Sequence, residues 1–419
     1  MESGNLRVTM RWQYYHTVWF TLLFGWLILY SNRMILSPIL VPLMEEFHLT
    51  YTEAGFLFAA YFYAYVIMML PAGFLGDRVG RKKILCIGTV CWSFATFLIG
   101  ITTTFFQIFF LRVVMGLGQG TYFGNDRPIV SSYTPKEKMG VGQGLSMIGM
   151  GVGLALGVAL GGILAQTIGW RMTFFVMAVP AFLFSFLVWK FLREPPRIHL
   201  VSEKPSYSLA FKSRDILILA LVSFLLFYPY WVFATWSPKM FLELGLKELA
   251  EASTFASLVG FSCIPGLLIS GVMSDRFVGK GFGRKIPAAF FIGITSLFTT
   301  LLGYELEIMV SVFVLAVSLF LGMMFLWGIW TFLYAIIADI VPREIYGTVF
   351  GFVNSVGFIN AIIAPVVAGW IRDVTGSFVW ACYLATFLLV IAVVLTLMIR
   401  PAFKAKPEIP IKVKKVSKH

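Results

Sequence analysis

Residues 73–83 read Gly73-Phe-Leu-Gly-Asp77-Arg78-Val-Gly80-Arg81-Lys82-Lys83, and the pattern returns as Gly271-Val-Met-Ser-Asp275-Arg276 followed by Gly283-Arg284-Lys285. Each copy is a short, glycine-rich, basic turn that lies between two long apolar stretches. A turn of this kind that recurs about 200 residues later indicates a membrane protein built from two similar halves.

The composition places the chain in lipid. Of 419 residues, 59% are hydrophobic and 13% are charged, and the mean hydropathy is +0.86. This much apolar surface cannot be buried in one soluble core, and windows of about 20 residues mark stretches long enough to cross about 30 Å of hydrocarbon. Twelve spans are predicted near 14–40, 51–75, 83–103, 106–132, 140–167, 170–193, 214–240, 248–274, 286–304, 307–338, 346–371 and 377–399.

A polar segment at 194–213, which opens with Glu194-Pro-Pro-Arg197, separates the halves. We therefore expect an all-α membrane protein with twelve transmembrane helices in two pseudo-symmetric six-helix bundles. The N-terminal bundle is predicted at 1–193, the C-terminal bundle at 214–400 and a basic cytoplasmic tail at 401–419.

Lysine and arginine gather on one predicted side of the membrane, whereas the opposite loops carry acidic residues. The basic clusters lie at 78–83, 190–214, 276–285 and in the tail. By the positive-inside rule, both termini of this multi-pass protein are expected in the cytoplasm, with the protein in the plasma membrane. The net charge of +13 then faces anionic lipid, and no nucleic-acid partner is expected.

The chemistry of an enzyme or a metal site is missing from the predicted spans. The four cysteines stand inside apolar spans at no metal-ligand spacing, and no histidine falls in the middle of a span. We therefore expect no cofactor, no metal and no enzymatic activity.

An arginine well inside an apolar span costs on the order of 3 kcal/mol or more. Arg33 and Arg112 are two such residues. Arg112, Gln119 and Asp126 recur every seven residues, so they share one helical face, which we interpret as a wall of a polar path. A guanidinium binds a carboxylate through two parallel hydrogen bonds, so the pattern favours an anionic ligand.

The turn at Asp77–Lys83, together with Arg112-Val-Val-Met-Gly116-Leu-Gly118, resembles the signatures of the major facilitator superfamily, and the resemblance covers essentially the whole chain. Within that superfamily, Tyr30-Ser-Asn32-Arg33, Thr235-Trp-Ser-Pro238 and Gly347-Thr-Val-Phe-Gly351-Phe-Val-Asn354 most resemble the organic-anion symporters that carry sugar acids and other carboxylates. The resemblance implies a monomeric secondary transporter that moves a small organic anion by alternating access.

The resemblance also implies roles for individual residues. Arg33 is expected to anchor a carboxylate, although a structural ion pair or a snorkelling side chain near the outer end of its helix remains open. Arg112 is also predicted to bind substrate, with an interhelical brace as the alternative. The other predicted substrate-binding residues are Asn32, Gln119, Tyr228, Tyr230 and Asn354. The predicted gating or structural residues are Asp77, Arg78, Arg81, Asp126, Arg127, Asp275, Arg276 and Asp339.

The sequence departs from the family at two positions that bear on coupling. Asn32 and Gln119 stand where proton-coupled members of the sugar-acid branch commonly have acids, and an amide does not titrate. Coupling to a proton or a cation, exchange and uncoupled transport therefore all stay open. The alternative function is a multidrug or metabolite exporter driven by proton antiport, which Val158 disfavours because the exporter signature has proline there.

The predicted fifth span carries glycines at four-residue spacing, namely Gly149, Gly153, Gly157 and Gly161, with Gly151 and Gly162 beside them. Small residues at this spacing form one ridge, which lets a neighbouring helix approach closely. We therefore predict a helix-packing seam along this span.

Overall fold

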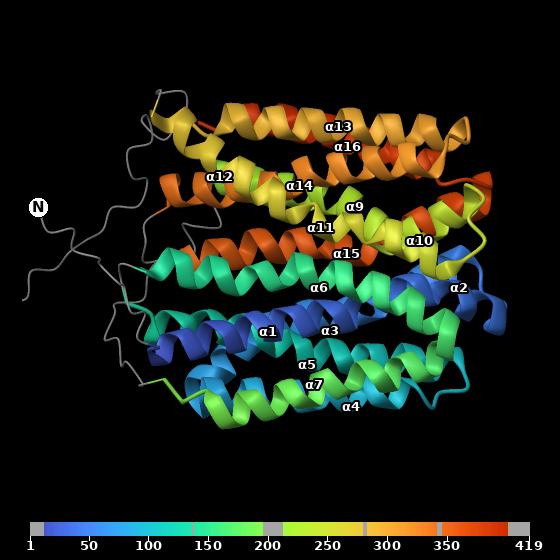
Figure 1. Ribbon diagram of the computed structural model, residues 1–419. Helices are drawn as coiled ribbons and strands as arrows, with labels where there is room; N and C mark the ends of the chain where they lie inside the picture. The colour runs from blue at the N-terminus through green and yellow to red at the C-terminus, as the bar shows by residue number, and fades with distance from the viewer. Residues whose placement is uncertain (1–11, 136–137, 196–212, 280–282, 342–345, 401–419) are drawn as a thin grey trace, which may run out of the picture.

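The computed structural model describes residues 12–135, 138–195, 213–279, 283–341 and 346–400, and these ranges fold into long helices joined by short turns (Figure 1). The helices are α1 (Tyr14–Met34), α2 (Leu36–Phe47), α3 (Tyr51–Val79), α4 (Arg81–Ile99), α5 (Phe105–Tyr133), α6 (Met139–Ile168), α7 (Trp170–Phe191), α9 (Arg214–Glu243), α10 (Leu249–Ala256), α11 (Leu258–Phe261), α12 (Cys263–Gly279), α13 (Lys285–Glu307), α14 (Val312–Ile340), α15 (Tyr346–Thr375) and α16 (Val379–Leu397). Most of the predicted linker and all of the predicted tail lie outside the described residues.

Eleven segments among the described residues are long and apolar enough to cross a membrane. Two of them are composite, because α1 continues into α2 over Tyr14–Phe47, and α10 continues through α11 and α12 over Leu249–Ser274. The twelfth long helix is α5, which has 29 residues. Its buried polar residues, among them Arg112 and Asp126, lower its mean hydropathy. The predicted all-α fold of twelve membrane helices is confirmed, with the first span extending to Phe47 instead of ending near residue 40.

The helices pack in two groups. Within α1–α7, α3 packs on α5, α1 on α6, and α4 on both α5 and α7; within α9–α16, α9 packs on α15 and α16, and α13 on α14 and α16. We call these groups the N-terminal bundle (α1–α7) and the C-terminal bundle (α9–α16). They meet where α3 lies against α15 and where α6 lies against α10 and α11. Figure 1 shows the helices side by side, with α13 and α16 at one edge and α4 and α7 at the opposite edge.

The two copies of the sequence motif each place a glycine of positive φ just before a helix. Gly80 has a φ of +122° between α3 and α4, and Gly283 has a φ of +68° just before α13, a backbone region that glycine occupies without strain. The arginine that follows each glycine bonds to another helix of the same bundle. Arg81 donates to the Gly124 carbonyl oxygen of α5 at 3.0 Å, and Arg284 pairs with Asp339 of α14.

The glycine ridge of α6 holds α1 at close range, as predicted. A Cβ atom added at Gly153 would lie 2.9 Å from the Cβ atom of Tyr30, and one at Gly157 would lie 2.5 Å from the Ser31 carbonyl oxygen. The Ser31 hydroxyl donates to the Gly153 carbonyl oxygen at 3.0 Å. On another side of α6, a Cβ atom at Gly151 would overlap the Cys263 side chain of α12. The small residues of α6 therefore bring both α1 and the C-terminal bundle close.

We predict that Gly153→Ala lowers the melting temperature of the detergent-purified protein, because the added methyl group pushes α1 away from α6. Overpacking of this kind typically costs about 1–3 kcal/mol. The matched control is Gly293→Ala in α13, where no atom lies within 4 Å of the new Cβ, so the better helix propensity of alanine stabilises by about 1 kcal/mol. Equal melting temperatures for the two variants in a fluorescence-detected thermal ramp would contradict the close packing of α1 on α6.

Candidate functional site

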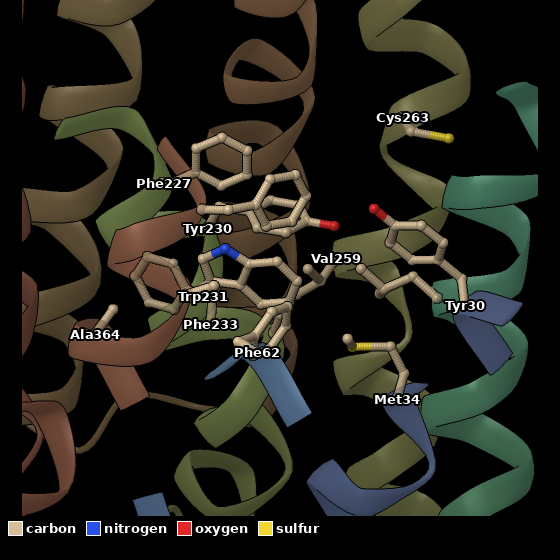
Figure 2. Close-up of a cluster of buried hydrophobic side chains, with 14 of the residues drawn as sticks. Tyr30, Met34, Phe62, Phe227, Tyr230, Trp231, Phe233, Val259, Cys263 and Ala364 are labelled. Carbon is tan, nitrogen blue, oxygen red and sulfur yellow. The ribbon is translucent and has the colours of Figure 1, made fainter. Parts of the chain in front are cut away.

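A buried layer of aromatic rings joins the two bundles at their centre (Figure 2). Figure 2 shows the hydroxyl groups of Tyr30 from α1 and Tyr230 from α9 pointing toward each other. Nearby, the rings of Phe62 and Trp231 pack edge to face with centroids 4.5 Å apart. Tyr30 is 2% exposed and Tyr230 is 3% exposed, so the centre of the molecule is closed in this conformation.

Arg33 lies in this closed centre, surrounded by aromatic rings. Its guanidinium carbon lies 4.5 Å from the ring centroid of Tyr30 and 4.7 Å from those of Tyr61 and Tyr65, three residues that we call the tyrosine cage. The Arg33 side chain is wholly buried, and its Nη2 donates to the Tyr61 hydroxyl. Among the described residues, its Nε and Nη1 atoms make no hydrogen bond of good geometry, and it forms no ion pair with a carboxylate.

The cage follows from helical spacing. Tyr61 and Tyr65 are four residues apart in α3, so their rings lie on the same face of that helix and stack with centroids 5.3 Å apart. Tyr63, between them, points elsewhere and is only partly buried. The sequence interpretation missed both cage residues of α3, although the run Tyr61-Phe-Tyr63-Ala-Tyr65 carried the signal at helical spacing.

The second buried arginine is braced by the backbone of α3. Arg112 Nη2 donates to the Phe58 carbonyl oxygen at 3.3 Å, and its guanidinium carbon lies 5.3 Å from the Tyr61 ring centroid. The ring of Tyr61 therefore contacts both guanidinium groups, which concentrates positive charge on one side of the centre. The Nε atom of Arg112 is buried and has no partner among the described residues.

The two predicted amides contribute unpaired acceptors. Asn32 Nδ2 donates to the Ile28 carbonyl oxygen at 3.0 Å, and Gln119 Nε2 donates to the Leu29 carbonyl oxygen at 3.4 Å. Only the NH₂ group of an amide can donate to a carbonyl, so these bonds fix which way each amide points. The oxygens Asn32 Oδ1 and Gln119 Oε1 are left buried without a described partner.

The C-terminal bundle brings one of its two predicted tyrosines to the centre. Tyr230 lies near Arg33 and Tyr30, whereas Tyr228 lies near Cys382 of α16 inside its own bundle. Side chains two positions apart in an α-helix point about 200° away from each other around the helix axis, because each residue turns the helix by about 100°. This explains why Tyr228 and Tyr230 face opposite ways. The predicted Asn354 accepts a hydrogen bond from the Tyr334 hydroxyl at 2.9 Å, so its side-chain oxygen already has a partner.

The predicted acid Asp126 is wholly buried and is held by two neighbours. Its Oδ2 atom accepts from Trp26 Nε1 at 2.8 Å and from Arg127 Nε at 2.9 Å. Its carboxylate therefore joins α5 to α1 and is matched by one cation, an arrangement that fits the predicted gating or structural pair.

The predicted gates at the helix ends form local contacts. Asp77 pairs with Arg81 four residues later in sequence, across the turn between α3 and α4. The Arg78 guanidinium lies 4.0 Å from the centroid of a neighbouring phenylalanine ring. Arg276 is exposed, and the side chain of Asp275 lies outside what the structure describes.

The bundles are bonded to each other at the end where α3 begins, which we call the Tyr51 end. Both carboxylate oxygens of Asp373 in α15 accept backbone N–H bonds from the first turn of α3, from Tyr51 at 3.0 Å and from Thr52 at 2.8 Å. A negative charge at a helix N-terminus satisfies free N–H groups and the helix dipole. Nearby, Gln166 of α6 bonds to the Glu248 carboxylate and accepts from the Ala250 N–H at 2.7 Å. We call these contacts the Tyr51-end latch.

A cavity of 610 Å³ also opens at the Tyr51 end, between the ends of α9, α13 and α15 and the start of α16. Its lining includes Arg372, which donates from Nε to the Glu243 carboxylate at 3.0 Å, and Tyr383. None of the predicted substrate-binding residues lines this cavity, so it is separate from the central cluster.

Comparisons with known proteins agree with this architecture. The chain is 26% identical over 391 residues to a hexuronate transporter of Bacillus subtilis (strain 168), covering 87% of this chain and 89% of that protein. It is 26% identical over 389 residues to a probable galactarate/D-glucarate transporter of Escherichia coli (strain K12), covering 83% and 86%. The fold also matches a bacterial homologue of the human lysosomal transporter Spinster, crystallised in an inward-facing and occupied conformation, with a TM-score of 0.79 at 16% identity, over 93% of this chain and 97% of that one.

The family assignment rests on a match that spans nearly the whole chain. The family model of the Major Facilitator Superfamily matches residues 22–304 and 277–418. The two matched segments include both copies of the glycine-rich basic turn, both buried arginines and the helices that meet at the Tyr51 end. This chain therefore belongs to the Major Facilitator Superfamily.

Proposed function

We propose that this protein is a secondary transporter that carries a small hydroxylated carboxylate, of the sugar-acid class, by alternating access. The observation that carries the proposal is Arg33, a wholly buried guanidinium with two unpaired nitrogens and no carboxylate partner among the described residues. A buried donor without a partner is unfavourable, and a carboxylate satisfies two guanidinium N–H groups at once. The bound anion would also neutralise the arginine charge.

The unpaired amide oxygens favour a substrate with hydroxyl groups. Asn32 Oδ1 and Gln119 Oε1 can only accept hydrogen bonds, and a hydroxyl group is a donor that a plain carboxylate lacks. The two relatives described above are named for the transport of hexuronates and of galactarate and D-glucarate. Each of these compounds carries both carboxylate and hydroxyl groups. Their chemistry supports the sugar-acid class for this chain.

Alternating access would operate between the two bundles. In the proposed orientation, with both termini in the cytoplasm of a cell bounded by the plasma membrane, the Tyr51 end faces outward. The Tyr51-end latch would then close the outer side while the opposite end separates to admit or release substrate. Because the two bundles of one chain surround the whole site, we propose that the monomer is the working unit.

The exporter alternative is weaker on electrostatic grounds. Arg33 and Arg112 place two guanidinium groups near the centre, and a lipophilic cation entering there would be repelled. We therefore keep the organic anion as the proposed substrate.

We predict that sugar acids raise the melting temperature of the purified protein and that Arg33→Ala abolishes this effect. A ligand at 100 times its Kd stabilises the folded state by about 2.7 kcal/mol, and without the guanidinium the carboxylate loses its anchor. The measurement is a thermal-shift screen with sugar acids, other carboxylates, phosphates and lipophilic cations. The control is Arg171→Ala, an arginine that pairs with Glu46 away from the centre and should leave the response intact.

Two results of this screen would contradict the proposal. Stabilisation by lipophilic cations alone would indicate an exporter. A response to sugar acids that survives unchanged in Arg33→Ala would show that the anion binds elsewhere.

We also predict that Asp373→Ala shifts the population toward molecules that are open at the Tyr51 end, because two backbone N–H groups of α3 lose their partner in α15. The measurement is the distance distribution between spin labels at Glu45→Cys and Lys247→Cys, two exposed positions at this end, with the native cysteines replaced. The long-distance fraction should rise several-fold. The control Glu307→Ala removes a carboxylate that bonds within the C-terminal bundle, to Tyr383, and should leave the distribution unchanged. An equal shift in both variants would argue against the latch.

A further inference from the structure

No described residue offers an opposite charge to the Arg33 guanidinium. The Arg33 side chain is wholly buried, and the aromatic rings around it are buried as well. A carrier that has released its substrate on one side must return through a form in which this arginine is buried without an anion. A bare guanidinium in a closed apolar centre is strongly disfavoured, so something in this protein must stabilise it.

The tyrosine cage supplies that stabilisation. Three ring centroids lie within 4.7 Å of the Arg33 guanidinium carbon, and a fourth ring, that of Phe62, lies at 5.5 Å. The face of an aromatic ring carries negative electrostatic potential, and the attraction to a cation grows when both are removed from water. The Tyr61 hydroxyl adds an acceptor for one guanidinium N–H.

The described ionisable groups that face Arg33 directly are phenols and a guanidinium group, and the nearest carboxylate among them lies one layer further out, at Asp126. The ionisable groups around it are Tyr30 of α1, Tyr61 and Tyr65 of α3, Arg112 of α5, Tyr230 of α9 and, beyond Tyr65, Asp126 of α5. Phenols and guanidinium groups titrate far above neutrality. The Asp126 Oδ2 atom accepts from Trp26 and Arg127, and its Oδ1 atom has no partner among the described residues, so Asp126 is the carboxylate that the experiment below tests. The amides Asn32 and Gln119 do not titrate.

We propose that the tyrosine cage stabilises the Arg33 charge in the empty carrier, and that the protein therefore carries its anion without a coupled proton. This inference rests on the proposed function. With a monoanion bound, the pair of Arg33 and substrate is neutral, and the empty carrier returns with one positive charge held by the rings. Each complete cycle thus moves one negative charge in the direction of transport.

This charge movement fixes how voltage acts on the transporter. An interior-negative membrane potential drives a monoanion outward, and an interior-positive potential drives it inward. At equilibrium, the concentration ratio of a monoanion changes tenfold for about every 60 mV. A proton gradient without a potential should produce no accumulation.

The experiment uses the purified full chain in proteoliposomes with radiolabelled D-glucuronate as the probe. Valinomycin and potassium gradients set the potential at equal pH, and a pH gradient is imposed separately with the potential clamped at zero. We expect the internal concentration of the probe to reach about ten times the external concentration at an interior-positive potential of about 60 mV, and no accumulation from the pH gradient. Accumulation that follows the pH gradient, and is lost in Asp126→Asn, would overturn the inference by showing that Asp126 carries a coupled proton.

The cage itself is tested by comparing two fluxes of the same probe. Exchange of internal for external D-glucuronate never requires the empty carrier to return, whereas net flux does. In Tyr65→Leu, which removes one ring face, net flux should fall at least tenfold more than exchange. In Tyr65→Phe, which keeps the ring, the ratio of the two fluxes should stay near that of the wild type. A loss of both fluxes in equal proportion in a Tyr65→Leu protein that is stably folded would refute the role of the cage.

Different results would contradict the proposed function and the proton-free mechanism. If the wild-type protein exchanges no D-glucuronate, the proposed sugar-acid function fails, and the inference fails with it. If exchange is present but net flux ignores the membrane potential, the transporter stands and the proton-free mechanism is wrong.

Discussion

The burial of one guanidinium among aromatic rings constrains the rest of the molecule. Arg33 costs on the order of 3 kcal/mol or more within a membrane-spanning helix, and its environment must offset that cost. The glycines of α6 let α1 approach closely and so fix the position of Arg33, while α3 presents Tyr61 and Tyr65 on the facing side. The close contact of α1, α3 and α6 is therefore both a packing solution and an electrostatic one.

Glu194 and Asp373 both cap helix N-termini from distant parts of the chain, and they differ in what they join. Glu194 accepts backbone N–H bonds from Arg81 and Lys82 at the start of α4, which closes a turn within the N-terminal bundle. Asp373 does the same at the start of α3 but comes from the other bundle. A contact within one bundle survives when the bundles move as rigid bodies, whereas a contact between bundles must form and break in each cycle.

The sequence predicts the membrane helices well because hydrophobic length is a property of each segment alone. It also singles out Arg33, because a charge in an apolar span is conspicuous. Tyr61 and Tyr65 are not conspicuous in a chain with 17% aromatic residues, and only their facing partner reveals their role. Asp373 lies more than 300 residues from the helix that it caps, so no local pattern announces that bond. The opposite orientations of Tyr228 and Tyr230 follow from helical geometry once the facing helices are known.

The polar character of α5 has a consequence for how the protein is made. Arg112, Gln119 and Asp126 are all wholly buried against neighbouring helices, and α5 falls outside the segments that are apolar enough to cross a membrane by themselves. A segment of this kind leaves the translocation channel unfavourably when alone, since its charges would face lipid. During biosynthesis, α5 must therefore be retained beside the insertion machinery until α1 and α3, synthesised earlier, can cover its polar face.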